Sequence, residues 1–288
     1  MLSMLRAGAF LFSILSLVGC PSEGDGVVKI SGSEAPASAS ASSQPEPVSP
    51  VWPEALPRDL EVPVPSRPIV VYLDAGHGAE NNPGNSSCFC EREQDFTLSL
   101  LDDVTNVLEE HGFVVVPSRF GSELVSYAKR IEAARKARAD AVVSLHSDIR
   151  GAGEEWSPDG AKTCLKSERA PGFSVLYADE GDGPLVAKRL VLARAISDAL
   201  IDAAFIPYQG GEYVGLYEGT PADRGVFVDR HAMDKRIFLL RRTEMPAVIV
   251  ETHNALDPRE ATAFEDPTVR RSFALAVARG LVAAFGGR

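Results

Sequence analysis

The segment IVVYLD, residues 69–74, is an unbroken run of apolar, mostly β-branched residues that ends in an aspartate. A run without alternating polar positions is typical of a strand covered on both faces, as in a parallel sheet between two layers of helices. The glycine-rich segment AGHG follows directly, at residues 75–78. Apolar residues then recur with helical spacing over 95–110, and Gly112 marks the helix end.

Strands and helices continue to alternate along the chain. After the first helix we predict, in order, a strand over 113–116, a helix over 123–138, strands over 141–146 and 174–177, a helix over 184–204, a strand over 247–250, and helices from 258 and over 267–285. Residues 150–172 read as a long irregular loop, and residues 205–236 as a loop or an added hairpin. Because βαβ units connect parallel strands through right-handed crossovers, we predict a single α/β domain: a mainly parallel, twisted sheet with helices on both faces.

The first 66 residues differ from the rest. Arg6 precedes an apolar stretch over 7–18 that is too short to span a bilayer and has the form of a secretory signal. The stretch ends in LVGC, residues 17–20, which resembles the lipobox of bacterial lipoproteins. We therefore predict a lipoprotein signal peptide over 1–19 and lipidation of Cys20.

The segment after the predicted lipidation site is rich in proline, serine and alanine. Such sequence buries too little apolar surface to fold, so we predict a disordered linker over 20–66 and a catalytic domain over 67–288. Pro21 stands where an aspartate retains lipoproteins in the inner membrane. We therefore expect a lipoprotein of the cell envelope, anchored in the outer membrane and facing the periplasm.

Overall composition limits the classes of partner. The chain of 288 residues carries 40 Asp and Glu against 29 Lys and Arg, a net charge of −11, and 45% of its residues are hydrophobic. A nucleic-acid surface needs a basic face, so we expect no nucleic-acid partner.

Three titratable residues lie at or just after the ends of predicted strands: His77, His146 and Glu251. The carboxyl ends of parallel strands share one edge of the sheet, where open α/β folds place their sites. Two imidazoles and nearby carboxylates are ligands that Zn²⁺ prefers. The pattern therefore predicts a zinc site at this edge.

Four segments in order carry a family resemblance. They are DAGHG (74–78), EQDFTL (93–98), VSLHSD (143–148) and PAVIVE (246–251). Together they resemble the successive motifs of the zinc-dependent N-acetylmuramoyl-L-alanine amidases of type 3. These bacterial hydrolases cleave the amide bond that joins N-acetylmuramic acid of peptidoglycan to L-alanine of the stem peptide.

The resemblance implies a phosphorylase/hydrolase-like fold, peptidoglycan as substrate and Zn²⁺ as cofactor. By position, it places the metal ligands on His77, Glu93 and His146, and the catalytic glutamate on Glu251. Glu91 is then a solvated neighbour. The resemblance does not identify substrate-binding residues, an activating partner protein or the oligomeric state.

Two departures from the family pattern leave alternatives open. Residues 77–80 spell H-x-x-E, the metal motif of zinc carboxypeptidases, so a zinc metallopeptidase acting on stem peptides through His77, Glu80 and His146 is one alternative. A peptidoglycan-binding lipoprotein without catalysis is another, because Ala79 and Asp148 replace a glycine and an amide that the family usually carries.

Several side chains near the predicted site have two interpretations each. Asp148 either orients a ligand histidine or belongs to a loop, and His253 either stabilises an oxyanion or packs in the scaffold. Arg119 and Arg130 either steer anionic groups of the substrate or form structural ion pairs.

Three cysteines lie in the predicted catalytic domain, and they have two interpretations, a disulfide or ligation of zinc. An exported protein favours one disulfide, which would join Cys164 to Cys88 or to Cys90. The pairing stays open at this point. Within the loop over 150–172, acidic side chains could cap the metal as an inhibitory plug; these are Glu154, Glu155 and Asp159.

Overall fold

The computed structural model describes residues 57–286, so the predicted signal peptide, Cys20 and most of the predicted linker lie outside the described residues. The elements are β1 (Val70–Ala75), α1 (Glu93–Glu110), β2 (Val114–Pro117), α2 (Tyr127–Ala137), β3 (Ala141–Asp148), β4 (Glu154–Trp156), β5 (Cys164–Lys166), β6 (Ser174–Tyr177), α3 (Gly183–Asp202), η1 (Gly211–Tyr213), β7 (Tyr217–Gly219), β8 (Val226–Asp229), α4 (Phe238–Arg242), β9 (Ala247–Asn254), α5 (Pro258–Ala263) and α6 (Pro267–Phe285). Within this part of the chain, no helix has the length and apolar character needed to cross a bilayer.

One seven-stranded sheet forms the centre of the domain, in the order β2-β1-β3-β9-β6-β8-β7. The strands β2, β1, β3 and β9 are mutually parallel. β6 runs antiparallel to β9 and parallel to β8, and β7 closes the edge antiparallel to β8. The prediction of a single α/β domain with a mainly parallel sheet is confirmed.

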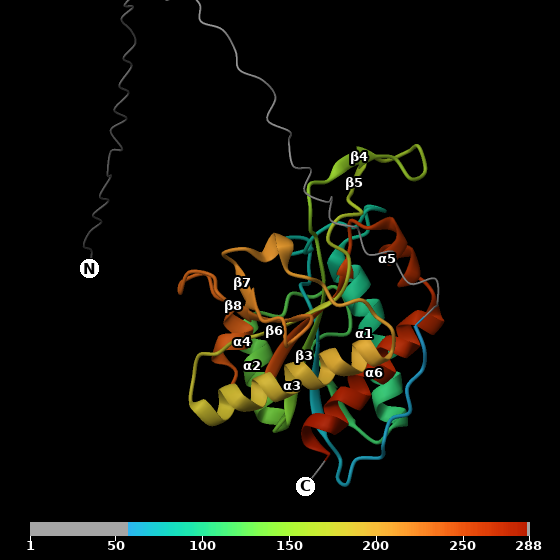
Figure 1. Ribbon diagram of the computed structural model, residues 1–288. Coiled ribbons are helices and arrows are strands. Elements are labelled where there is room, and N and C mark those ends of the chain that lie inside the picture. The colour runs from blue at the N-terminus through green and yellow to red at the C-terminus, as the bar shows by residue number, and fades with distance from the viewer. Residues whose placement is uncertain (1–56, 287–288) are drawn as a thin grey trace, which may run out of the picture. The chain divides into compact units, whose positions relative to one another are not determined.

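Helices cover both faces of this sheet (Figure 1). α1, α3 and α6 pack on one face, and α2 and α4 on the other. Alternate residues of β1 follow this division: Val71 and Leu73 join the core under the first three helices, whereas Tyr72 joins the core on the opposite face. Because both faces are buried, the strand has no polar side, as its sequence indicated.

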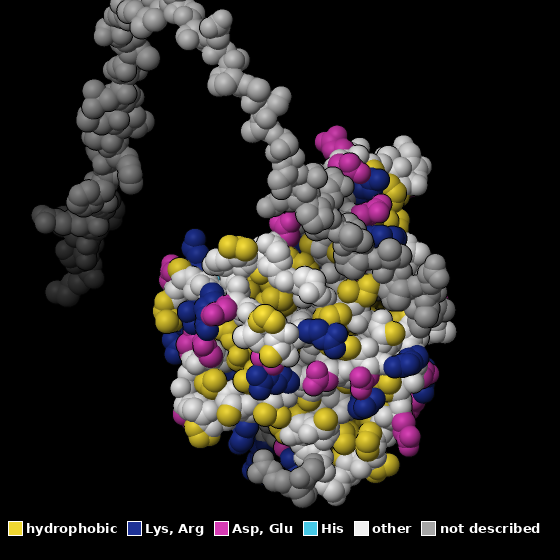
Figure 2. Space-filling model, in the orientation of Figure 1, with side chains coloured by type: hydrophobic (Ala, Val, Ile, Leu, Met, Phe, Trp, Pro, Cys, Tyr) yellow, Lys and Arg dark blue, Asp and Glu magenta, His cyan; other side chains and the backbone are white. Residues whose placement is uncertain are grey.

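Charged side chains of both signs are interspersed over the visible surface (Figure 2). Among the described residues, many charged side chains form exposed pairs of opposite charge, such as Arg271 with Glu110 and Lys136 with Glu132. Pairs this exposed contribute little to stability. The acidic balance of the chain is therefore not concentrated in one patch on this face.

Element boundaries differ from the prediction where side chains cap or extend an element. α2 begins at Tyr127, not at residue 123, because the side chain of Ser126 accepts a hydrogen bond from the backbone N–H of Lys129. α1 begins at Glu93 itself, two residues earlier than expected. β9 continues to Asn254 and places Glu251 inside the strand.

Part of the segment predicted as linker packs against the domain. Val62 is buried in the main core, and Nε of Arg58 donates a hydrogen bond of 2.8 Å to the carbonyl of Asp202. The hydroxyl of Ser272 donates to Asp59 at 2.7 Å. Packing against the domain therefore begins before residue 67, within residues 57–62.

Both irregular segments contain a hairpin. β7 and β8 form one within residues 205–236 and extend the main sheet. β4 and β5 form the other within residues 150–172, as a separate two-stranded sheet that stands out from the body of the domain (Figure 1).

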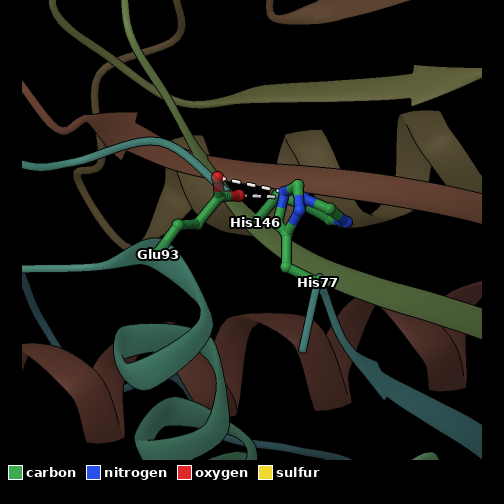
Figure 3. Close-up of side chains that lie close together, drawn as sticks. All are labelled: His77, Glu93 and His146. Carbon is green, nitrogen blue, oxygen red and sulfur yellow. Dashed lines mark hydrogen bonds and ion pairs between the residues drawn. The ribbon is translucent and has the colours of Figure 1, made fainter. Parts of the chain in front are cut away.

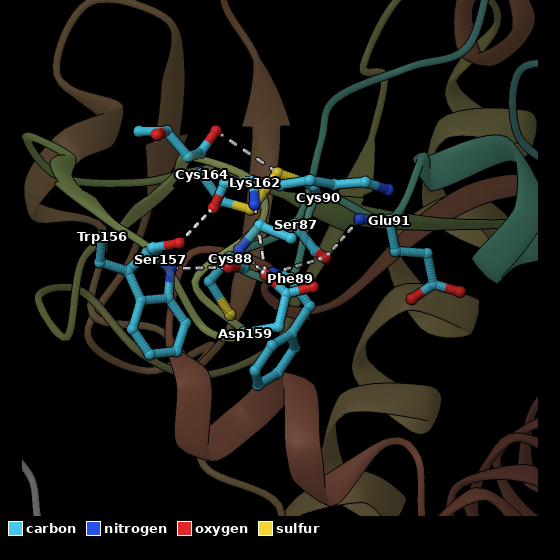
Figure 4. The surroundings of a disulfide bond; sticks show 12 residues. Ser87, Cys88, Phe89, Cys90, Glu91, Trp156, Ser157, Asp159, Lys162 and Cys164 are labelled. Carbon is cyan, nitrogen blue, oxygen red and sulfur yellow. Dashed lines mark hydrogen bonds between the residues drawn. A yellow bond between two sulfur atoms is a disulfide. The ribbon is translucent and has the colours of Figure 1, made fainter.

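A disulfide between Cys90 and Cys164 ties the second hairpin to the segment before α1 (Figure 4). The Cα atoms are 5.5 Å apart. Next to it, the indole N–H of Trp156 donates to the carbonyl of Cys88 at 2.6 Å, and its ring packs against Phe89 at 5.7 Å between centroids. Of the two predicted pairings the structure forms Cys90–Cys164. Cys88 is a buried free thiol, and burial raises its pKa to about 12.

Replacing both Cys90 and Cys164 by serine should lower the free energy of unfolding by about 2–4 kcal/mol, since the bridge spans 74 residues of chain. Urea denaturation measures this change. Reducing agent should destabilise the wild type and leave the double variant unaffected. Equal stability of both proteins under oxidising conditions would refute the role of the bridge.

Candidate metal centre

His77, Glu93 and His146 converge at the carboxyl edge of the sheet (Figure 3). One potential ligand atom of each lies within 4.8 Å of the others. His77 follows β1, Glu93 is the first residue of α1, and His146 lies near the end of β3. Segments remote in sequence thus form one cluster of two imidazoles and a carboxylate, as the sequence predicted.

Glu93 is the centre of this cluster and is only 4% exposed. Its Oε2 lies 3.1 Å from Nε2 of His77, and its Oε1 lies 2.9 Å from Nδ1 of His146. The carboxylate also accepts hydrogen bonds from two backbone N–H groups, those of Asn85 at 3.0 Å and Ser147 at 3.2 Å. Four donors therefore fix one carboxylate in place.

The same contacts decide the charge of these groups. Burial alone would raise the pKa of Glu93, but the hydrogen bonds from His146 and His77 outweigh it and hold the pKa well below its usual range. Burial alone would lower the pKa of His77, but the hydrogen bond and charge of Glu93 raise it. Glu93 is therefore an anion that attracts cations, protons or a metal ion.

Two glycines leave room for the ligands. A Cβ atom at Gly76 would lie 2.4 Å from Cε1 of the His146 ring. A Cβ atom at Gly84 would lie 2.5 Å from Oε2 of Glu93 and 2.7 Å from Cδ2 of His77. Side chains at either position would displace the donor atoms, so the backbone is shaped around the cluster.

Two buried arginines hold the turn that carries His77. Arg130 forms an ion pair with Asp74 and donates to the carbonyl of His77. Arg119 donates to the carbonyl of Gly76 at 3.0 Å. Both side chains are inaccessible to a substrate. Steering of anionic groups is therefore wrong for both; Arg130 forms the expected structural ion pair, whereas Arg119 binds main-chain carbonyls instead of an acidic side chain.

Glu251 lies beside the cluster. In the sheet register it stands opposite His146 on β3 and opposite Ser174 on β6. Burial, and then the negative charges of Asp148 and Glu93, raise its pKa well above the usual value. Its Oε2 is buried and has no hydrogen-bond partner within residues 57–286. An unpaired carboxyl oxygen with raised proton affinity is suited to proton transfer.

Asp148 does not contact a ligand histidine. Its Oδ2 accepts a hydrogen bond of 2.6 Å from the hydroxyl of Tyr213 and lies 3.4 Å from Nε of Arg150. The Tyr213 hydroxyl also lies 2.9 Å from that of Ser174. Asp148 therefore anchors the segment around η1 to β3, and of its two interpretations the orientation of a ligand histidine is wrong.

His253 belongs to the scaffold. It is buried, its ring stacks on Phe264 at 4.7 Å, and its Nδ1 lies 2.8 Å from the hydroxyl of Thr252. Burial, and then the charge of Arg150, lower its pKa to about 3. A neutral, fully packed imidazole is a poor group for stabilising an oxyanion.

The other predicted acidic groups lie outside the cluster. The side chain of Glu80 is 91% exposed and pairs with Arg92 at 3.1 Å, so the H-x-x-E arrangement does not form. Glu91 is also exposed, as expected.

The acidic side chains of the second hairpin do not cap the cluster in the described structure. Glu154 pairs with Lys166 at 3.2 Å, within the same hairpin. Asp159 accepts hydrogen bonds from the backbone of Ala161 and Lys162 at the hairpin turn. These side chains serve the hairpin, and they are not part of the ligand cluster.

Sequence reasoning did not select the residues that support the ligands. Asn82 lies 3.1 Å from Nδ1 of His77, and Asn85 and Ser147 bind Glu93 through their backbone. Gly84 was the one available signal, because a glycine near a predicted ligand indicates close approach of the backbone.

An α/β protein with two histidines and a glutamate at the carboxyl edge of its sheet, and a second glutamate beside them, has the arrangement of a metal-dependent hydrolase. Residues 71–283 match the N-acetylmuramoyl-L-alanine amidase family. The match covers most of the chain, which therefore belongs to this family.

Individual relatives are distant. The probable cell wall amidase LytH of Staphylococcus aureus is 24% identical over 212 residues, which make up 73% of this chain and 56% of LytH. The chain thus spans about half the length of this curated relative. Among solved structures, Ami1 of Mycobacterium smegmatis aligns with a TM-score of 0.60 and 21% identity over 77% of this chain and 99% of Ami1. An amidase from Clostridium difficile 630 aligns with a TM-score of 0.59 and 20% identity over 77% and 100%. These likenesses show the fold.

Replacing Gly76 by alanine should weaken metal binding by roughly 10- to 100-fold, because the new methyl group displaces His146. Metal titration against a chelator measures the affinity, and far-UV circular dichroism checks the fold. Gly211→Ala is the matched control, since a Cβ there meets no atom within 4 Å. Unchanged affinity in the Gly76 variant would contradict the tight fit around the His146 ring.

Proposed function

We propose that this protein is a zinc-dependent N-acetylmuramoyl-L-alanine amidase, which hydrolyses the bond between N-acetylmuramic acid and L-alanine of the peptidoglycan stem. The observation that carries the proposal is the cluster of His77, Glu93 and His146 with the unpaired carboxyl group of Glu251 beside it. Membership of the amidase family supports the substrate.

The residues present suit a zinc ion. Two imidazoles and one carboxylate are a donor set that catalytic zinc sites use. Because Gly76 and Gly84 have no side chain, the donor atoms have room to approach one another. Bound zinc supplies Lewis-acid chemistry, which makes water a stronger acid and polarises a carbonyl group. An amide is a weak electrophile with a poor leaving group, so its hydrolysis needs this assistance.

Glu251 is the proton carrier of the proposed reaction. Its raised pKa suits a group that accepts a proton from the attacking water and then delivers it to the nitrogen of the departing alanine. Within residues 57–286 no hydrogen-bond partner occupies its Oε2, so this oxygen is not committed to another protein group. The tightly held Glu93 is the less suitable base, because four donors already bind it.

We further propose that the protein acts in the cell envelope as a lipoprotein. The lipobox-like segment ending in Cys20 supports a membrane anchor, and Pro21 supports the outer membrane as its place. The disulfide between Cys90 and Cys164 is consistent with an oxidising compartment such as the periplasm. Peptidoglycan, the proposed partner, lies within reach of such an anchor.

The two alternatives from the sequence lack a supporting observation. A metallopeptidase using Glu80 requires a ligand that here points to solvent and pairs with Arg92. A binding module without catalysis has no use for a partly buried glutamate whose Oε2 has no partner within residues 57–286, next to a cluster of potential metal ligands.

Replacing Glu93 by glutamine should abolish tight zinc binding, since the central anion of the cluster is lost. Replacing Glu80 by glutamine is the matched control and should leave zinc content unchanged. Elemental analysis of the dialysed proteins provides the measurement. Retained zinc in the Glu93 variant, or its loss in the Glu80 variant, would overturn the ligand assignment.

Replacing Glu251 by glutamine should reduce activity by about 10²- to 10⁴-fold while zinc remains bound. Mass analysis of digested peptidoglycan detects the reaction: the wild type should release free stem peptides and leave the glycan strands intact. Shortened stems still attached to glycan would instead identify a peptidase. Full activity of the Glu251 variant would exclude its role as proton carrier.

A further inference from the structure

Asn82 lies at the end of a turn wound in an unusual conformation. Three successive residues, His77, Gly78 and Ala79, have positive φ angles of 62°, 133° and 66°. Residues that carry a side chain rarely adopt positive φ. Two backbone hydrogen bonds then close the turn, from Gly78 N–H to the carbonyl of Asn82 at 3.0 Å and from Asn82 N–H to the carbonyl of Ala79 at 3.1 Å. The chain therefore returns to His77 at residue 82.

This return brings the side chain of Asn82 to the imidazole. Its Oδ1 lies 3.1 Å from Nδ1 of His77, on the opposite side of the ring from Nε2, which faces Glu93. An amide oxygen only accepts hydrogen bonds, so Nδ1 must carry the proton. Nε2 donates to Glu93 in this structure, so loss of that proton leaves a neutral His77 whose free electron pair lies on Nε2, the nitrogen that points into the cluster.

The other two ligands have restraints of their own. Glu93 is held by two backbone N–H groups, and the ring of His146 lies against Gly76. The side chain of His77 is the most exposed of the three, at 22% against 11% for His146. Within the described residues, Asn82 is the one hydrogen-bond partner of its ring from outside the cluster. The orientation of His77 therefore depends on Asn82 most directly.

We propose that Asn82 is a positioning residue for the metal centre, which fixes the ring orientation and the tautomer of His77 through the contact between its Oδ1 and Nδ1. This inference rests on the proposed function in taking His77 as a metal ligand. No sequence motif marks Asn82. Its role is inferred from the closed turn, which brings its side chain to His77. Partners of this kind typically change metal affinity by 10- to 100-fold when they are removed.

The test compares zinc affinity in the full chain and in its Asn82→Ala, Asn82→Asp and Asn81→Ala variants, by competition with a chromogenic chelator. We expect Asn82→Ala to bind zinc about 10- to 100-fold more weakly. Asn82→Asp should restore the affinity, because a carboxylate accepts the same hydrogen bond. Asn81, its exposed neighbour, is the matched control, and Asn81→Ala should bind zinc like the wild type.

A second readout separates positioning from general damage to the fold. Nitrogen-15 NMR of the zinc-free protein, at a pH at which His77 is neutral, should show His77 with its proton on Nδ1, and Asn82→Ala should show a mixture of tautomers. Wild-type affinity and an unchanged tautomer in Asn82→Ala would overturn the inference and leave the proposed function intact. Absence of zinc binding by the wild type would instead overturn the proposed function.

Discussion

The backbone turn after β1 is the constraint on which the site depends, and two buried arginines hold it. Removing a guanidinium group from water costs several kcal/mol, and one that keeps its hydrogen-bond partners inside recovers most of that cost. Arg130 pairs with Asp74, whose other oxygen accepts from Ser144, while Arg119 binds main-chain carbonyls of the turn. These bonds fix β1, the turn and α2 to one another. They thereby hold the backbone of His77 in one orientation relative to the sheet.

A concentration of negative charge follows from this geometry. Glu93, Glu251 and Asp148 lie within electrostatic range of one another; Arg150 offsets part of this charge near Glu251, and His77 and His146 offset part of it at Glu93. Like charges at such range are unfavourable unless protons or a cation compensate. The negative charge of the site, which residues from three strands and one helix contribute, is therefore not fully balanced by the protein. Such a site suits the binding of a divalent ion.

Much of the fold was predictable because burial on both faces of a sheet leaves a direct trace in sequence. The apolar runs before His77, His146 and Glu251 predict strands, and parallel strands bring their ends to one edge. Tertiary contacts decided the rest. The partner of Nδ1 of His77 depends on a turn closed by backbone hydrogen bonds, which no periodicity indicates, and the choice of Cys90 over Cys88 depends on which thiol points to the hairpin. The sequence left the role of Asp148 open, because its partner Tyr213 comes from a glycine-rich segment without a clear pattern.

The burial of Cys88 has a consequence for the chemical durability of the molecule. A thiol two residues from a disulfide is well placed to attack it and exchange partners, but only the thiolate form is nucleophilic. With a pKa of about 12 and no access to solvent, Cys88 is almost entirely protonated at neutral pH. Once folded, the protein is therefore protected against scrambling of its own cross-link, although a potential rival sulfur lies next to it in the chain.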